Sequence, residues 1–289
     1  MTDILITGVL LGATYALMAM GLTLQYGVAR IMNLANGEML VAGAFGAFWF
    51  FSGHKLSPYL AMGVVVPAAF LLNWLIYRLL LAPLVRRAKN RGQLEVDSIL
   101  ATFGMSFVMV GLFLTLFGGN FFSYSYLAVP VQIFGSAFGL NRVVAFGAAV
   151  LICGGLYALL SASRLGRAIR AVAVDPAAAA LVAIDVPRVS AFSFALGGAV
   201  TAAAGVVLSS FLTLDASIGV MFTMKALIIV IMGGVGEVRG AVLAALILGL
   251  AETAVATLID PGLTLAAAYA LFIAVLLLRP QGLLGRRVS

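Results

Sequence analysis

The residues best placed to do chemistry in this sequence are charged side chains inside or beside apolar runs. Glu252 lies in the middle of ALILGLAETAVATL, and Glu38 ends the polar stretch GVARIMNLANGE. Within lipid, each such group costs several kcal/mol unless it is paired or hydrated. We therefore expect Glu252 to face a water-filled pathway or a partner helix.

Three other charged residues have simpler explanations. Asp215 and Lys225 bracket a short apolar segment, and we expect both to be interfacial loop residues. Arg30 lies in the polar stretch before Glu38, where it is explained as readily by a positive anchor on the cytoplasmic side of the membrane as by function.

Residue combinations typical of enzymes are absent from the sequence. The only histidine, His54, stands beside Lys55 and has no second histidine to form the pair that a zinc protease needs. A P-loop requires Gly-Lys-Ser/Thr, whereas the lysines here follow His54, Ala88 and Met224. We therefore expect no catalytic residue, no metal site, no cofactor bound by this chain and no ATP hydrolysis through such a loop.

Composition indicates the environment of the chain. Of its 289 residues, 64% are hydrophobic and 9% are charged, against roughly 25% charged residues in soluble globular domains. The net charge of +7 suggests a nucleic-acid partner at first sight. However, the basic residues cluster in short loops beside apolar runs, as membrane orientation requires. The sequence therefore predicts a single membrane domain over residues 1–289 with no nucleic-acid partner.

Apolar segments of suitable length recur along the whole chain. A helix crosses a bilayer core of roughly 30 Å with about 20 apolar residues. On this measure the expected spans are Ile4–Tyr26, Met39–Phe51, Pro58–Pro83, Ser98–Phe117, Arg142–Ser161, Ser190–Leu212, Val220–Met232, Ala241–Ile259 and Leu263–Leu278. The second and seventh are short and lie beside glycine breaks. The prediction is an all-α polytopic membrane protein with eight or nine transmembrane helices and short loops.

Basic residues set the expected orientation. If the basic loop Arg86–Gln93 is cytoplasmic, alternation places the stretch Ser163–Pro187, the turn Gly233–Gly240 and the C-terminus on the same side. The N-terminus is then external if the number of crossings is odd. Gly118–Asn141 is expected to be an external loop. The polar stretch at residues 27–38 reads as a loop or a broken helix, and transport sites are often built at interrupted helices.

One stretch, Ser163–Pro187, leaves the membrane between two spans. Its first half carries three arginines, and Asp175-Pro176 is a good start for a second short helix, because Asp caps helix N-termini and proline fits the first turn. Contact with anionic lipid would explain the arginines. It would not explain Gly166 or the uncharged helix expected at Ala177–Ala183. We therefore expect a cytoplasmic platform on which another protein docks.

Five stretches, in order along the chain, give it a family resemblance. They are GLTLQYGVARIMNLANGEMLVAGA (residues 21–44), ILATFGMSFVMVGLFLTLFG (99–118), SRLGRAIRAVAVDPAAAALVAIDV (163–186) with FSFALGGAVTAAAGVV after it, GGVGEVRGAVLAALILGLAE (233–252) and LRPQGLLG (278–285). Together they resemble the LivH-type permease subunits of branched-chain amino acid ABC importers. The resemblance implies a type II-like permease of the bacterial inner membrane that carries aliphatic amino acids.

The resemblance also implies partners and residue roles. A LivM-like second permease, two cytoplasmic ATPases similar to LivG and LivF, and an external substrate-binding protein would complete the importer. The ATPases would use ATP and magnesium and move the platform Ser163–Pro187 as a coupling lever. The expected docking residues are Gly166, Arg167, Arg170, Asp175 and Pro176. The expected translocation-pathway residues are Asn33, Asn36, Glu38, Thr102, Ser106 and Glu252.

The chain departs from the family pattern at four positions. Asn36 stands where the family usually has histidine, and Ala183 where it usually has glycine. Glu237 and Arg239 replace smaller or apolar residues, which could alter helix packing or partner choice.

Two alternatives to an amino acid importer remain open from the sequence. Asn36 leaves room for an ABC permease that carries another small solute, such as urea, a short amide or a sugar. An ion-coupled secondary transporter could instead use Glu38 and Glu252 as its proton or cation sites. Such a transporter would act as a single chain under an ion gradient, without ATPase partners.

Overall fold

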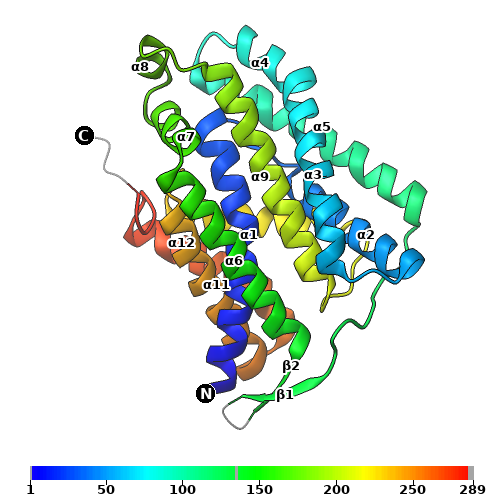
Figure 1. Cartoon of the computed structure of the whole chain (residues 1–289). Coiled ribbons are helices and arrows are strands. Elements are labelled where there is room, and N and C mark those ends of the chain that lie inside the picture. The colour runs from blue at the N-terminus through cyan, green and yellow to red at the C-terminus, as the bar shows by residue number, and fades with distance from the viewer. Residues whose placement is uncertain (1, 134–135, 286–289) are drawn as a thin grey trace.

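The chain folds into a helical bundle with one small hairpin (Figure 1). The structure is a computed structural model that describes residues 2–133 and 136–285. In chain order its elements are α1 (Thr2–Ala29), α2 (Asn36–His54), α3 (Pro58–Ile76), the π turn η1 (Tyr77–Leu81), α4 (Ala82–Arg87), α5 (Arg91–Phe117), β1 (Pro130–Ile133), β2 (Ser136–Gly139), α6 (Leu140–Ala162), α7 (Arg164–Val174), α8 (Pro176–Leu181), α9 (Val186–Ser209), α10 (Ile218–Gly233), α11 (Val238–Leu258), the short 3₁₀ turn η2 (Pro261–Leu263) and α12 (Thr264–Leu278).

Seven helical segments in the described part of the chain are long and apolar enough to cross a membrane. They are Asp3–Ala29, Pro58–Arg87, Gly92–Phe117, Leu140–Ala162, Val186–Ser209, Val238–Leu258 and Pro261–Leu278. The all-α polytopic class is therefore confirmed. The two expected spans that are short correspond to α2 and α10, which fall outside the seven, so a count of eight or nine depends on these two helices.

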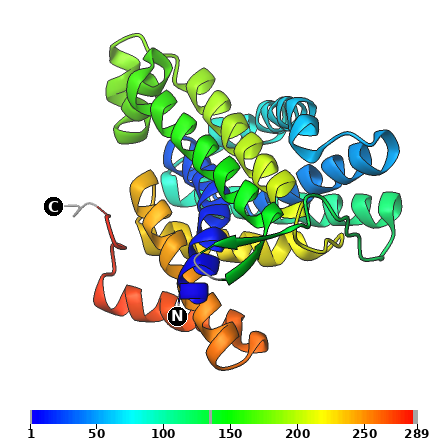
Figure 2. The ribbon, with the colours of Figure 1, turned by 60° about the horizontal axis from the view of Figure 1, so that its bottom comes forward.

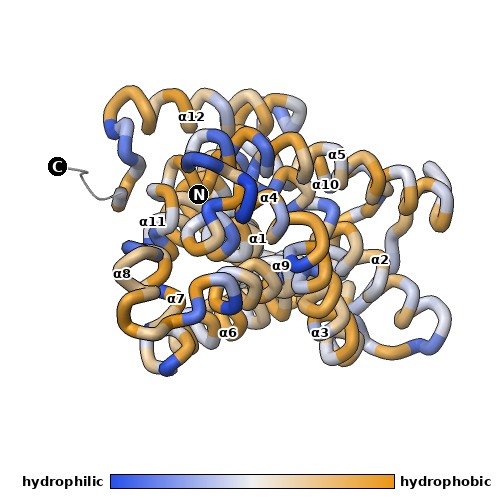
Figure 3. The backbone as a smooth tube through the Cα atoms, turned by 90° about the horizontal axis from the view of Figure 1, so that it is seen from above, coloured by the Kyte–Doolittle hydropathy of each residue, from blue (hydrophilic) through white to orange (hydrophobic). Residues whose placement is uncertain are grey.

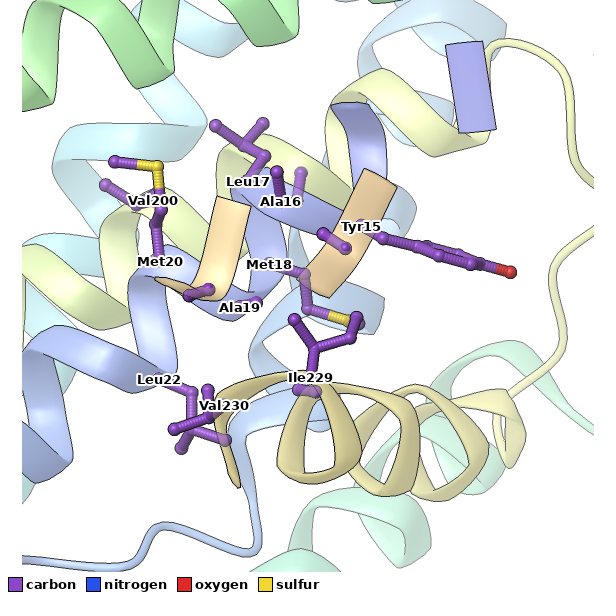
Figure 4. Close-up of a cluster of buried hydrophobic side chains, with 14 of the residues drawn as sticks. Tyr15, Ala16, Leu17, Met18, Ala19, Met20, Leu22, Val200, Ile229 and Val230 are labelled. Carbon is purple, nitrogen blue, oxygen red and sulfur yellow. The ribbon is translucent and has the colours of Figure 1, made fainter. Parts of the chain in front are cut away.

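The core lies along α1 and α9, which pack against each other and are buried over most of their length. Figure 4 shows side chains of α1, among them Met18 and Leu22, beside Ile229 and Val230 of α10. The peripheral helices α3, α5 and α12 are hydrophobic along much of their length (Figure 3) and largely exposed. Such an exposed apolar surface suits lipid or another membrane subunit.

Helices from the N-terminal and C-terminal parts of the chain pack against each other. α1 lies along α11 and α9 lies along α3, while α2 packs on α9 and α10 packs on α11. The short helices α2 and α10 meet at their N-terminal ends, because a Cβ added to Gly37 would collide with the carbonyl oxygen of Gly219. Two helix starts therefore lie inside the bundle, although no internal repeat can be recognised in the sequence.

Small residues make the closest helix contacts. A Cβ at Gly8 would lie 2.8 Å from Leu250 Cα, and one at Gly12 would lie 2.8 Å from Leu246 Cα. α1 and α11 therefore touch backbone to backbone, which is the use of small residues in membrane helices. These glycines therefore pack within one chain.

The segment expected to be an external loop is more ordered than the sequence indicates, because it contains an antiparallel hairpin of β1 and β2. Before the hairpin, Phe122 forms a β-bridge with Leu214, which lies between α9 and α10. The hydroxyl of Tyr124 lies 2.6 Å from Ser209 Oγ. Burial raises the pKa of Tyr124 to about 12, so this hydroxyl stays protonated at neutral pH. The described part of the segment lies over one end of the bundle (Figure 2).

Candidate translocation and docking sites

The chain breaks between α1 and α2, as the polar stretch at residues 27–38 predicts. α1 ends just before Arg30, whose backbone is left-handed with φ 56°, and α2 starts at Asn36. The side-chain oxygen of Asn33 accepts a hydrogen bond from Ala35 N at 3.0 Å and so helps to turn the chain into α2. The break is shorter than predicted because both helices extend into the polar stretch.

Thr102 on α5 forms hydrogen bonds with backbone groups of the break that have no partner within a helix. Its hydroxyl oxygen accepts a hydrogen bond from Leu34 N at 3.1 Å and lies 3.1 Å from the carbonyl oxygen of Met32. Unsatisfied backbone groups are so costly in lipid that irregular segments persist there only against protein or water. At this break, protein supplies the partner.

Polar side chains from five helices meet around the break, and we call this group the polar seam. Asn33 Nδ2 donates to Gln25 Oε1 at 2.9 Å. Ser106 Oγ on α5 donates to Glu38 Oε1 on α2 at 3.1 Å. The seam consists of Gln25, Asn33, Asn36, Glu38, Thr102, Ser106, Thr201 and Thr223. It brings together five of the six residues expected in the pathway.

The sequence reasoning missed the other three seam residues, Gln25, Thr201 and Thr223. Thr201 of α9 donates to Asn36 Oδ1 at 3.0 Å, and Thr223 of α10 accepts from the backbone N of Gly37 at 2.8 Å. A glutamine inside an apolar span was a usable signal. The threonines were not, because a threonine in a membrane helix commonly bonds to its own backbone.

The seam is closed to solvent in this conformation. Ser106 is its most exposed member at 7%. Within the described residues, Asn36 Nδ2 and Glu38 Oε2 have no hydrogen-bond partner. The seam therefore ties helices together here, and the role of its members in translocation stays a prediction.

The buried carboxylate of Glu38 lies where α2 and α10 begin. It belongs to the first turn of α2, and a Cβ added to Gly219 near the start of α10 would lie 2.5 Å from Glu38 Oε2. Negative charge is favoured at a helix N-terminus, because the helix dipole is positive there. The dipoles of two helices thus stabilise the charge of Glu38, whose carboxylate receives one side-chain hydrogen bond, from Ser106.

Glu252 lies apart from the seam and pairs with a lysine. Its Oε2 is 2.8 Å from Lys225 Nζ and 2.8 Å from the hydroxyl of Tyr15, and Lys225 Nζ lies 2.7 Å from the same hydroxyl. The group joins α1, α10 and α11. Glu252 therefore faces partner helices, one of the two environments expected for it.

The prediction that Lys225 is an interfacial loop residue is wrong. α10 begins at Ile218 and places Lys225 inside the bundle with 6% of its surface exposed. The sequence contained a signal for this pairing. A charge buried in a span needs a partner of opposite charge, so Glu252 could have indicated a buried lysine such as Lys225. Asp215 does lie in a loop, where it accepts a hydrogen bond from Ser217 N at 2.6 Å.

The platform consists of two short helices, as predicted. Asp175 caps α8 by accepting from the backbone N of Ala177 at 2.9 Å and of Ala178 at 3.1 Å, and Pro176 is the first residue of that helix. Ser163 caps α7 by accepting from Gly166 N at 2.8 Å. α8 is shorter than expected and ends at Leu181.

The expected docking residues occupy different positions on the platform. Gly166 is buried, and a Cβ there would lie 2.5 Å from the carbonyl oxygen of Leu159 at the end of α6. Arg170 donates to the carbonyl oxygens of Leu160 at 2.5 Å and Ser161 at 3.3 Å. These two residues therefore anchor α7 to α6, while Arg167 is exposed and contacts α6 only through a long bond of 3.5 Å to the carbonyl oxygen of Ala162.

The platform also presents an apolar tip that the sequence analysis did not single out. Leu181 is 89% exposed, Val174 70% and Val182 69%. The sequence contained only a partial signal, because the segment also has other bulky apolar residues, such as Val172, that are buried. Together with Arg167 they form a mixed apolar and basic surface suited to a protein partner.

Two of the departures from the family pattern have structural counterparts. Ala183 adopts a left-handed backbone with φ 61°, a conformation that favours glycine. Arg239 donates a hydrogen bond to the hydroxyl of Tyr157 and so connects α11 with α6.

A membrane bundle with an interrupted helix, charges buried at depth and a two-helix platform outside the spans is the architecture expected of a transport permease. The chain belongs to the family of permease components of branched-chain amino acid transport systems, whose sequence profile matches residues 4–278. The resemblance to LivH-type permeases is thereby confirmed.

Individual relatives match over three quarters or more of their length. The high-affinity branched-chain amino acid transport system permease protein LivH of Salmonella typhimurium is 31% identical over 295 aligned positions, covering 96% of this chain and 94% of the relative. The corresponding protein BraD of Pseudomonas aeruginosa is 31% identical and covers 98% of this chain and 95% of its own. A probable LivH of Methanocaldococcus jannaschii is 27% identical and covers 82% of this chain and 75% of its own.

Proposed function

We propose that this chain is the membrane permease subunit of an ATP-driven importer for branched-chain and similar aliphatic amino acids. The observation that carries the proposal is the family match over residues 4–278, which includes both the helix break and the platform. The relatives are named as permeases of high-affinity branched-chain amino acid transport systems.

The proposed topology has nine crossings, with α2 and α10 included, an external N-terminus and a cytoplasmic C-terminus. α4 and the platform lie at one end of the bundle, and the N-terminus and the hairpin at the other (Figure 1). The C-terminal segment returns to the platform end, since Leu283 N donates to Met232 O at the end of α10 at 2.8 Å. Basic residues concentrate at that end, which supports the proposal that it faces the cytoplasm of a bacterial inner membrane. Arg286 and Arg287 of the tail lie outside the described residues.

Partner proteins supply the energy and the substrate in this proposal. Two cytoplasmic ATPases of the LivG and LivF type bind the platform, a LivM-like permease packs beside this chain, and an external binding protein delivers the amino acid. ATP-driven closure of the ATPases displaces α7 and α8. Gly166 and Arg170 pass the displacement to α6, and Arg30, whose guanidinium donates to Ala173 O at 2.8 Å, passes it to the helix break and the polar seam.

Uptake of radiolabelled leucine into proteoliposomes tests the proposal. We expect ATP-dependent uptake only when this chain is combined with both ATPases, the second permease and the binding protein. Unlabelled valine and isoleucine should compete with the label, whereas urea and sugars should not. Uptake by this chain alone under a proton or sodium gradient would overturn the proposal and make Glu38 and Glu252 the sites of ion coupling.

A further inference from the structure

A groove of about 820 Å³ opens at the platform end of the bundle, between the C-terminal end of α3 and the start of α9. η1 and α4 continue α3 along one wall, and residues 185–192 form the other wall. In Figure 1, α4 and the start of α9 lie at the platform end, and α3 runs beside α9. The groove is separate from the polar seam, since none of the seam residues lines it.

Two arginines in this groove have no acidic partner. Arg78 of η1 and Arg86 of α4 both line the groove and are exposed, and neither forms an ion pair in the part of the chain that the structure describes. Arg188 also lines the groove, but it pairs with Asp185 at 2.8 Å, so those two charges cancel. The two unpaired guanidinium groups therefore give the groove a net positive charge.

A rare turn in the backbone brings these two arginines to one side. Eight residues apart on a regular α-helix, Arg78 and Arg86 would point about 80° away from each other. η1 is a π turn, closed by the bond from Ala82 N to the carbonyl oxygen of Tyr77, and its wider turn reduces that angle. Pro83 explains the distortion, because it has no N–H to continue the α-helical bonds. π turns inside helices are frequent at functional sites.

The unpaired arginines lie at the level expected of lipid head groups. α3 begins at Pro58, and the rise from there to Arg78 is about 30 Å, the thickness of a bilayer core. Trp74 also lines the groove, and the guanidinium of Arg78 lies 5.1 Å from the centroid of its ring. Tryptophan is enriched at the boundary between membrane and water. Stacking on a ring leaves the N–H groups of a guanidinium available to an anion.

An apolar surface extends the groove along α3 and α9. A second hollow of about 610 Å³ lies on these two helices nearer their other ends, with α6 as its third wall. The rings of Phe70 and Phe192, with centroids 5.3 Å apart, lie between the two hollows. Phe192, Leu196 and Ala199 recur at helical spacing and share one face of α9. From Phe192 to Ala203 the helix rises about 16 Å, or about half of the bilayer core, which is the depth that one acyl chain spans.

We propose that this groove binds one anionic phospholipid. The phosphate pairs with Arg78 and Arg86, since guanidinium groups bind phosphate oxygens strongly and with defined geometry. An acyl chain lies along α3 and α9, over apolar surface that a free phosphate would leave uncovered. Because α9 begins directly after the platform, the lipid contacts the segment that joins the platform to the membrane. The inference goes beyond the proposed function and does not depend on it.

The chain has two tryptophans, Trp49 and Trp74, and one of them lines the groove. Trp49→Phe leaves Trp74 as the sole fluorophore of its kind, and bromine on the acyl chain of a neighbouring lipid quenches it. The full-length chain is placed in nanodiscs of phosphatidylcholine that contain increasing fractions of brominated phosphatidylglycerol or of brominated phosphatidylcholine. We expect phosphatidylglycerol to quench Trp74 at a fraction at least about fivefold lower, since each basic residue near an anionic surface contributes about that factor.

Variants of the arginines locate the phosphate. Arg78→Gln and Arg86→Gln should each reduce the preference for phosphatidylglycerol by about fivefold. Arg87→Gln is the matched control, because it removes an exposed neighbouring arginine that does not line the groove, and it should retain the preference. Each signal is divided by that of the same variant in unbrominated lipid, because Arg78 stacks on Trp74. If Trp49→Phe damages the fold, the difference in quenching between the unmodified chain and Trp74→Phe gives the same quantity.

Four results would overturn the inference. Equal quenching by the two brominated lipids would show that the groove does not select anionic lipid. Equal losses of preference in Arg87→Gln and Arg86→Gln would assign the preference to the overall surface charge. Absence of quenching by either lipid would mean that another copy of the chain covers the groove. Loss of the preference in inorganic phosphate, but not in chloride of equal ionic strength, would make the groove a site for free phosphate.

Discussion

The guanidinium of Arg30 donates a hydrogen bond to the carbonyl oxygen of Ala173 at 2.8 Å. Arg30 is the first residue after α1, and Ala173 lies in the last turn of α7, where the helix dipole favours a positive charge. The bond is therefore a direct connection between the platform and the helix break. Arg30 holds it from a left-handed backbone, an uncommon conformation for a residue with a side chain.

Replacing Arg30 should uncouple ATP hydrolysis from transport. Arg30→Asn removes the guanidinium, while Asn tolerates the left-handed backbone better than most residues. Loss of a hydrogen bond from a charged group corresponds to about tenfold, so we expect leucine uptake to fall by about that factor with little change in ATP hydrolysis by the assembled importer. Arg188→Gln, an exposed arginine at the same end of the bundle, is the control and should change neither rate. Equal losses of uptake and hydrolysis in Arg30→Asn would contradict a coupling role.

Because Lys225 pairs with Glu252, the effects of mutating the two residues on the stability of the permease should not be additive. Removing one partner leaves a buried charge uncompensated, which costs about 3–5 kcal/mol. We therefore expect Glu252→Gln and Lys225→Met each to lower the Tm of the purified permease clearly and to reduce its uptake or yield. The double variant Lys225→Met with Glu252→Gln should be more stable than either single variant. A double variant whose losses simply add would show that the two groups do not interact.

Features that depend on local sequence could be predicted. Apolar length predicted the seven long spans. The caps by Asp175 and Ser163 act within three residues of themselves, so the platform follows from its own sequence. The break at Arg30 likewise follows from a polar, glycine-containing stretch that cannot continue an apolar helix.

Features that depend on which helices become neighbours could not be predicted. Tyr15 and Lys225 are 210 residues apart, and no periodicity indicates that α1 and α10 bring them together. The anchoring of α7 by Gly166 and Arg170 was not predicted, because the sequence does not show that the end of α6 lies beneath them. The hairpin of β1 and β2 was missed because strands of four residues each carry too weak a pattern.

Ala183→Gly should stabilise the chain. A left-handed backbone costs a residue with a Cβ about 1–2 kcal/mol, and glycine loses about 0.5–1 kcal/mol through its greater entropy when unfolded. We expect a net gain of about 0.5–1 kcal/mol, measured as a higher Tm in detergent, with uptake unchanged. Ala180→Gly, an exposed alanine inside α8, is the matched control and should lower stability, since glycine is a poor helix former. A lower Tm for Ala183→Gly would show that the left-handed conformation carries no cost.

Charge reversal on the platform should separate docking from anchoring. Arg167 is exposed and makes only a long contact of 3.5 Å with the carbonyl oxygen of Ala162, so Arg167→Glu should abolish co-purification with the ATPases while membrane insertion stays unchanged and the Tm changes little. Leu181→Asp should act in the same way, because it places a charge on the apolar tip. Arg170→Glu should abolish co-purification and also lower the Tm, since it removes the bonds to the end of α6. Lys89→Glu, an exposed reversal between α4 and α5, is the control and should retain the ATPases. Full retention of the ATPases by Arg167→Glu and Leu181→Asp would place the docking surface elsewhere on the chain.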